Sequence, residues 1–171
     1  MQLRLCFSHR FCRLCNELKI PELFLKKQLE KSLKNIKKRI KAKRLFFDTH
    51  GNLLCSSYVC MQNDGLIRIQ TYSIDDKCLS KKQKNFLLDV WHELRHFQQD
   101  KIYGMNMDEY SMKDMSEANS KYFNSQIEKD ARKYEKKSLK IYKSLKKLTI
   151  NQIKNSRNAK KIKTDIKTSN S

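Results

Sequence analysis

The sequence contains few of the residues that interrupt regular structure: its 171 residues include three Gly and one Pro. This scarcity excludes collagen-like chains and flexible low-complexity linkers, and it favours a helix-rich protein with few tight turns. No apolar run approaches the roughly 20 residues of a membrane-spanning helix, so no membrane partner is expected. The first 15 residues lack the apolar segment of a signal peptide, which predicts a cytoplasmic location.

Acidic residues are scarce relative to basic ones. The chain has 38 Lys and Arg against 18 Asp and Glu, a formal net charge of +20. Such a charge is sufficient for non-specific contact with nucleic acid phosphates, although no recognised nucleic-acid-binding motif occurs. Lysine-rich, solvated helix faces explain the same charge. Both interpretations therefore stay open.

Six cysteines are present, and three of them lie close together near the N-terminus. Because no export signal is apparent, reduced thiols are expected rather than a disulfide framework. Cys6, His9, Cys12 and Cys15 are spaced more tightly than usual zinc ligands, and no second CxxC follows. Buried thiols are therefore the simpler interpretation of this cluster.

In the first half of the chain, the composition changes near residue 45 from helix-prone to β-prone residues. Residues 1–44 form a basic N-terminal region that is predicted to be helical, with Pro21 opening an amphipathic helix to about residue 43. Between residues 46 and 72, β-prone segments alternate with turn residues. They predict two or three antiparallel strands in a small sheet.

The second half is predicted to be largely helical. A capping box at Ser80–Gln83 would open a helix that ends near Gly104, and helices are expected over 111–123 and from about residue 125. An apolar seam along the last helix runs to Leu148. Residues 156–171 are rich in Lys, Asn, Ser and Thr and predict a disordered basic tail.

The clearest chemical motif lies at residues 92–96, which read His-Glu-Leu-Arg-His, or HExxH. On a helix, positions i and i+4 share one face, so the imidazoles of His92 and His96 can bind one metal ion. Glu93 is rotated by about 100° and flanks the ion, where it can take a proton from metal-bound water. Apolar residues occupy the opposite side of the helix, which predicts one face in the core and one bordering a cleft.

A catalytic zinc ion needs three protein ligands and an open position for water. No His follows His96, which excludes families with a downstream His ligand, and the remaining choices downstream are carboxylates. Glu128 borders the apolar seam, and the small Ala131 would let its helix approach the HExxH helix closely. A capping box with Ser125 would also explain Glu128. Glu128 is the favoured ligand, and Glu117 is the alternative.

The pair of motifs HELRH and Glu128-x-Asp-Ala-x-x-Tyr134 resembles the ImmA/IrrE-type zinc peptidases and related gluzincin-like metallopeptidases of mobile elements. This resemblance implies a small α+β, zincin-like domain over residues 45–155, with the small sheet preceding the HExxH helix. It also implies one Zn²⁺ per chain, bound by His92, His96 and Glu128, with Glu93 as general base. Family members cleave repressor or regulator proteins.

Taken together, these features predict a zinc-dependent peptidase that hydrolyses a peptide bond in a protein substrate. The strand Leu66–Tyr72 could pair with an extended substrate, and Asp130 could support a ligand imidazole. Tyr122 and Tyr134 are more simply explained as packed aromatics than as catalytic groups. A basic nucleic-acid-binding protein and an inactive, zinc-stabilised interaction domain are the alternative functions.

Overall fold

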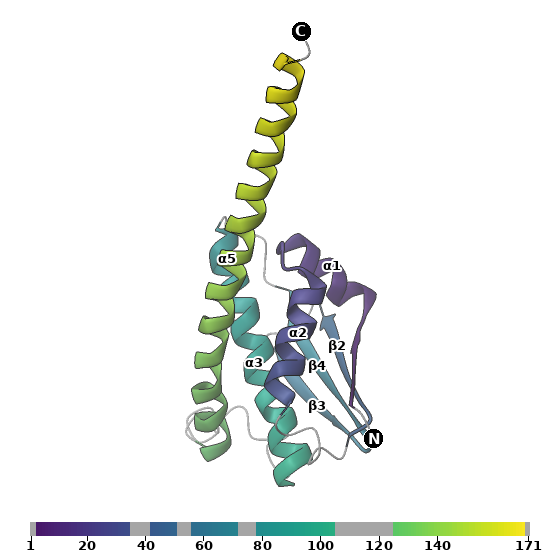
Figure 1. Ribbon diagram of the computed structural model, residues 1–171. Coiled ribbons are helices and arrows are strands. Elements are labelled where there is room, and N and C mark those ends of the chain that lie inside the picture. The colour runs from purple at the N-terminus through teal and green to yellow at the C-terminus, as the bar shows by residue number, and fades with distance from the viewer. Residues whose placement is uncertain (1–2, 35–41, 51–55, 72–77, 105–124, 170–171) are drawn as a thin grey trace.

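A computed structural model gives the chain an α+β fold in which helices predominate over one small sheet (Figure 1). The structure describes residues 3–34, 42–50, 56–71, 78–104 and 125–169. Among these residues, no helix is both long and apolar enough to cross a membrane. The elements in chain order are β1 (Arg4–Phe7), α1 (His9–Glu17), α2 (Glu22–Leu33), β2 (Arg44–His50), β3 (Ser57–Met61), β4 (Asp64–Gln70), α3 (Leu79–Tyr103) and α5 (Gln126–Ser169).

The sheet is mixed, so the prediction of a purely antiparallel sheet is wrong. Its strand order is β1-β2-β4-β3, with β1 and β4 both parallel to β2 and only β3 antiparallel to β4. Parallel pairing of β1 with β2 needs a long crossover, which α1 and α2 supply. β1 itself lies inside the region that was predicted to be helical. Its pairing with β2 is long-range and leaves little local signal.

The core lies between one face of the sheet and the helices α1, α2 and α3. Alternate residues of β2 and β4 are buried, as the period of a strand requires: Leu45 and Phe47 on β2, and Ile67 and Ile69 on β4. They join one apolar cluster with residues of all three helices. The indole Nε1 of Trp91 reaches Ser32 Oγ at 3.3 Å, so α2 is also tied to α3 by a polar contact.

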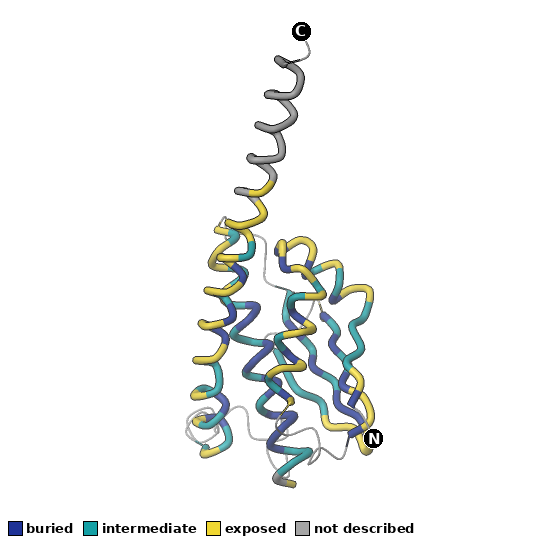
Figure 2. The backbone as a smooth tube through the Cα atoms, in the orientation of Figure 1, coloured by how far each residue is buried: buried dark blue, intermediate teal, exposed yellow. Residues whose placement is uncertain are grey.

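Helix α5 packs along α3, and Figure 1 shows α3 between α5 and the sheet. The predicted seam is confirmed at Ala131, Ser138, Ile141 and Leu145, which are buried, whereas its other members, Ile127, Tyr134 and Leu148, are half-buried. The positions between them are largely exposed (Figure 2). Beyond the body the helix continues to Ser169 (Figure 1). The composition had instead predicted a disordered tail over residues 156–171. That segment has no Gly or Pro to end a helix.

Helix boundaries agree with the sequence in some places and differ in others. Helix α2 follows Pro21 as predicted, and Gly104 ends α3 with a left-handed φ of 63°. The Ser80–Gln83 capping box is wrong, because α3 begins at Leu79 and has no side-chain cap. Gln83 instead donates to the carbonyl of Leu18 at 2.8 Å and fixes α3 to the end of α1. The helix predicted over 111–123 lies outside the described residues.

The three N-terminal cysteines differ in how deeply they are buried. Cys15 is buried in the core, and burial raises the pKa of its thiol to about 12. Cys6 and Cys12 are half-buried, and the described cysteines form no disulfide. The prediction of packed thiols is therefore confirmed for Cys15.

A single glycine sets the distance between the sheet and α3. A Cβ on Gly65 of β4 would lie 2.7 Å from the ring of Phe97 on α3 and 3.1 Å from the ring of Tyr58. Gly65→Ala is therefore expected to lower the free energy of unfolding by about 1–3 kcal/mol through overpacking, measured by urea denaturation. Adding Phe97→Leu should reduce the cost of the Ala substitution. An unchanged stability for Gly65→Ala would show that α3 can shift freely.

Candidate metal centre

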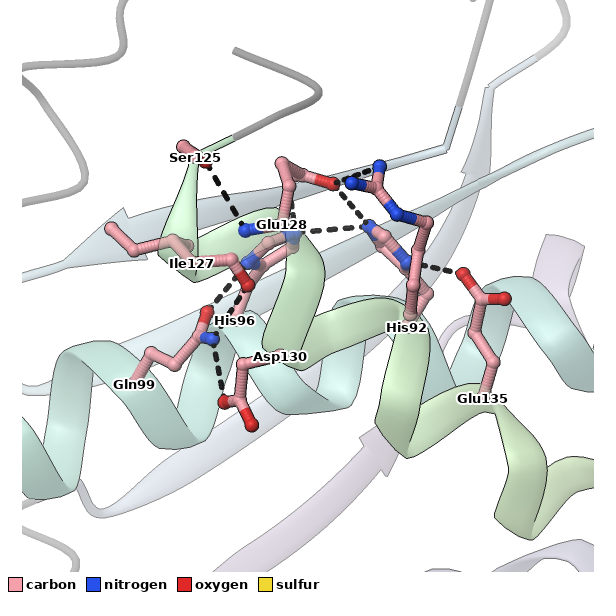
Figure 3. A network of polar contacts seen from close by, with 9 residues as sticks. His92, His96, Gln99, Ser125, Ile127, Glu128, Asp130 and Glu135 are labelled. Atoms are coloured by element: carbon pink, nitrogen blue, oxygen red, sulfur yellow. Dashed lines mark hydrogen bonds and ion pairs between the residues drawn. The ribbon is translucent and has the colours of Figure 1, made fainter. Parts of the chain in front are cut away.

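The two motif histidines and Glu128 come together between α3 and α5 (Figure 3). The imidazole Nε2 atoms of His92 and His96 lie 3.0 Å apart. Glu128 Oε1 lies 3.0 Å from His96 Nε2, and Glu128 Oε2 lies 3.3 Å from His92 Nε2. Each residue thus offers one donor atom, and all three atoms lie within 4.8 Å of one another. The three side chains predicted as ligands therefore converge on one point.

This donor set fits a divalent transition metal ion. A tetrahedral ion with ligand distances of about 2.0–2.2 Å holds its donor atoms roughly 3.3 Å apart. The observed separations of 3.0–3.3 Å match that spacing. Two imidazoles and one carboxylate also suit such ions chemically, and they leave a coordination position for water.

Glu128 reaches the imidazoles because of where α5 begins. It lies in the first turn of α5, and its backbone N–H donates to Ser125 Oγ at 3.2 Å. Ser125 therefore caps the helix as the sequence predicted, while the Glu128 carboxylate is 2 % exposed and faces the two imidazoles. The buried Ala131 adds no bulk between α5 and α3. Glu117, the alternative ligand, lies outside the described residues.

Gln99 fixes the orientation of His96. Its side-chain Nε2 donates to the carbonyl of Ile127 and to Asp130 Oδ2, both at 3.0 Å (Figure 3). The amide oxygen is therefore the group that faces His96 Nδ1, at 2.8 Å. A carbonyl oxygen can only accept, so His96 carries a proton on Nδ1, and its Nε2 is the nitrogen that faces Glu128 and His92 and is available to a metal ion. A metal ligand needs this tautomer.

His92 is held by a carboxylate that the sequence analysis did not single out. Glu135 Oε1 lies 2.7 Å from His92 Nδ1 (Figure 3). Glu135 follows Glu128 by seven residues, which is two helical turns, so both carboxylates share the face of α5 toward α3. That spacing was available in the sequence, but the register between the two helices was not.

Asp130 does not contact an imidazole, contrary to its predicted role. It accepts from Gln99 and, at 2.7 Å, from Arg95 Nε, so it supports His96 through Gln99. Burial opposes ionisation, yet these two donors lower the pKa of Asp130. Tyr134 accepts a hydrogen bond from Gln98 and lies under the Arg95 guanidinium, as expected of a packed aromatic. Tyr122 lies outside the described residues.

Glu93 is enclosed beside the ligands. It is 5 % exposed, and burial raises the pKa of its carboxyl to about 7 although His96 and His92 act in the opposite direction. Burial lowers the pKa of His92, but the carboxylates of Glu128, Glu93 and Glu135 outweigh it and raise that pKa to about 9. The negative charge that attracts this proton would equally attract a metal cation.

No protein-family model matches the chain, and no curated protein or solved structure matches it. Function is therefore inferred from the chain's own side chains.

The third ligand can be tested against its capping neighbour. Glu128→Ala should leave less than one zinc ion per chain under conditions where the unsubstituted protein retains one, because two imidazoles hold the ion poorly. Ser125→Ala should cost about 1 kcal/mol of stability and keep the ion. Metal analysis and thermal denaturation of both variants separate the two effects. Zinc loss in Glu117→Ala instead would contradict this ligand assignment.

Two adjacent glutamines of α3 allow a matched test of the hydrogen bond to His96. Gln98 and Gln99 are both buried, but only Gln99 contacts a ligand imidazole. Gln99→Ala should weaken zinc binding by about 10- to 100-fold, because the ring of His96 loses its orientation. Gln98→Ala should leave zinc affinity nearly unchanged. Chelator competition on the folded variants measures both, and equal weakening would contradict the role given to Gln99.

Proposed function

We propose that the chain is a zinc-dependent peptidase that hydrolyses a peptide bond in a protein substrate. The observation that carries the proposal is the meeting of Glu128 on α5 with both imidazoles of the HExxH motif on α3, with Glu93 enclosed beside them. Two imidazoles, one carboxylate and an adjacent general base are the parts of a catalytic zinc site in peptidases.

Each residue has a distinct role in this proposal. His92, His96 and Glu128 would hold the ion, while Glu135 and Gln99 keep the two imidazoles turned toward it. Zinc in such a site lowers the pKa of a bound water to about 7 and polarises a substrate carbonyl. Glu93 would accept the proton of the attacking water and return it to the leaving amine.

The edge strand β3 offers a place for an extended substrate. The sequence pointed to the following strand, β4, but β4 is paired with β2 on one side and β3 on the other. Its main-chain groups are therefore used within the sheet. Among the described strands, β3 ends the sheet on the side toward α3, so its outer edge is the one suited to β-addition by a peptide.

Polar contacts hold β3 beside the part of α3 that bears the motif. Ser56, just before β3, donates to Asp89 Oδ2 at 2.6 Å, one turn before Glu93. At the other end, Lys101 Nζ donates to the carbonyl of Met61 at 2.6 Å. The strand thus runs alongside α3 from before His92 to beyond His96. A peptide added to β3 would follow the same course, and a repressor or regulator protein is the substrate class that the resemblance implies.

Glu93→Gln tests the proposed chemistry. The amide keeps the shape of the side chain but cannot accept a proton, so zinc content should be unchanged while hydrolysis falls by about 10²–10⁴-fold. A library of proteome-derived peptides, incubated with the zinc-loaded protein and analysed by mass spectrometry for new termini, measures cleavage without a known substrate.

Gln98→Ala serves as the control, because it removes a buried amide of α3 that contacts no ligand. It should give the same new termini as the unsubstituted protein. Identical termini from Glu93→Gln would contradict the role of Glu93. A zinc-loaded protein that cleaves nothing in the library would contradict the peptidase and favour the inactive interaction domain.

A further inference from the structure

Six lysines form a single row along the solvent face of α5, here called the lysine stripe. They follow one another at alternating steps of four and three residues, and every one is exposed: Lys129, Lys133, Lys136, Lys140, Lys143 and Lys147. At 100° per residue, these steps keep all six within an arc of about 80°.

The stripe lies opposite the side of α5 that packs on the body. Ala131, Ser138, Ile141 and Leu145 are buried toward α3, roughly half a turn of the helix away from the lysines. Figure 2 shows these two sides as buried and exposed positions that alternate along the helix. The stripe therefore faces away from α3 and the core, about 100° around α5 from Glu128, and the fold leaves it accessible.

The positive charge of α5 is not balanced by acidic residues after Glu135. From residue 136 to residue 164 the sequence has eleven Lys and Arg and no Asp or Glu. Like charges at spacings of three and four residues repel one another, so a row of this kind costs helix stability rather than adding to it. An anionic partner would remove that cost.

The row is also long and straight. At 1.5 Å per residue, Lys129 and Lys147 are separated by about 27 Å along the axis. The helix continues past the body to Ser169 (Figure 1). In the sequence, Lys recurs every seven residues at positions 133, 140, 147, 154 and 161.

We propose that the lysine stripe binds the phosphate backbone of double-stranded nucleic acid. A duplex is a stiff rod that carries one negative charge per about 1.7 Å of its axis, so it can meet a straight row of cations at many points. Single-strand binders add aromatic platforms for the bases, but Tyr134 and Tyr142 of α5 are half-buried and lie about 100° around the helix from the edges of the stripe. A membrane-surface helix would need a free apolar face, but the seam opposite the stripe, from Ala131 to Leu145, is packed on α3.

Salt dependence of binding to a random-sequence DNA duplex tests the proposal on the full chain. Six phosphate contacts predict a loss of about a thousand-fold in affinity between roughly 50 and 200 mM salt. In the triple variant Lys140→Gln, Lys143→Gln, Lys147→Gln, the slope of log K against log salt should become shallower by about 2.7, since each contact contributes roughly 0.9. Gln keeps the helix propensity of Lys, and circular dichroism checks the helix.

The matched control removes three exposed lysines from α2: Lys26→Gln, Lys27→Gln, Lys31→Gln. Its net charge equals that of the stripe variant, but its slope should stay that of the unsubstituted protein. Equal losses in both variants would show an effect of net charge alone and overturn the proposal. So would stripe-dependent binding to vesicles of anionic lipid without binding to the duplex. Zinc content should not change in either variant, which separates this test from that of the peptidase.

Discussion

The packing of the first turns of α5 against α3 is the contact on which the candidate site depends. It buries the His96 imidazole, the Glu128 carboxylate and the Gln99 amide, and it half-buries His92 and Glu135. Burying such groups is unfavourable unless each finds a partner. Here Gln99, Glu135 and Asp130 supply partners for the groups around Glu128. These hydrogen bonds offset the cost of burying the polar groups, and they also orient the donor atoms toward one point. The stability of the interface and the geometry of the site therefore have the same cause.

Helix α3 connects this interface to the core. Trp91 and Phe97 pack inward, while their neighbours His92 and His96 face α5. Because Phe97 lies against Gly65 of β4, the position of the sheet sets the position of the helix that carries the ligands. A rigid helix with a buried apolar side cannot move one face without the other. The small sheet thus contributes to the site without supplying any of its ligands.

The sequence predicted those parts of the site that local periodicity determines. His92 and His96 share a face because they are four residues apart, and Glu128 was favoured because it borders a seam of helical period. Gln99 and Glu135 were missed as partners of the imidazoles, since their roles depend on the register between two helices that residues 104–125 separate in the chain. The parallel pairing of β1 with β2 was not predicted for a similar reason. A four-residue strand has too few positions to show a period, and its partner lies 40 residues away.

Helix α5 carries both a metal ligand and the lysine stripe, which the sequence analysis considered separately. Its inner side carries Glu128 and Glu135, and its outer side carries the lysine stripe, which begins at Lys129, the residue after the ligand. A helix cannot turn one side toward a partner independently of the other. A duplex lying along the stripe would therefore be held at a fixed position relative to the metal centre. A substrate bound to the same duplex would be concentrated near the site without making any contact with the stripe, as expected when two binding events share one scaffold.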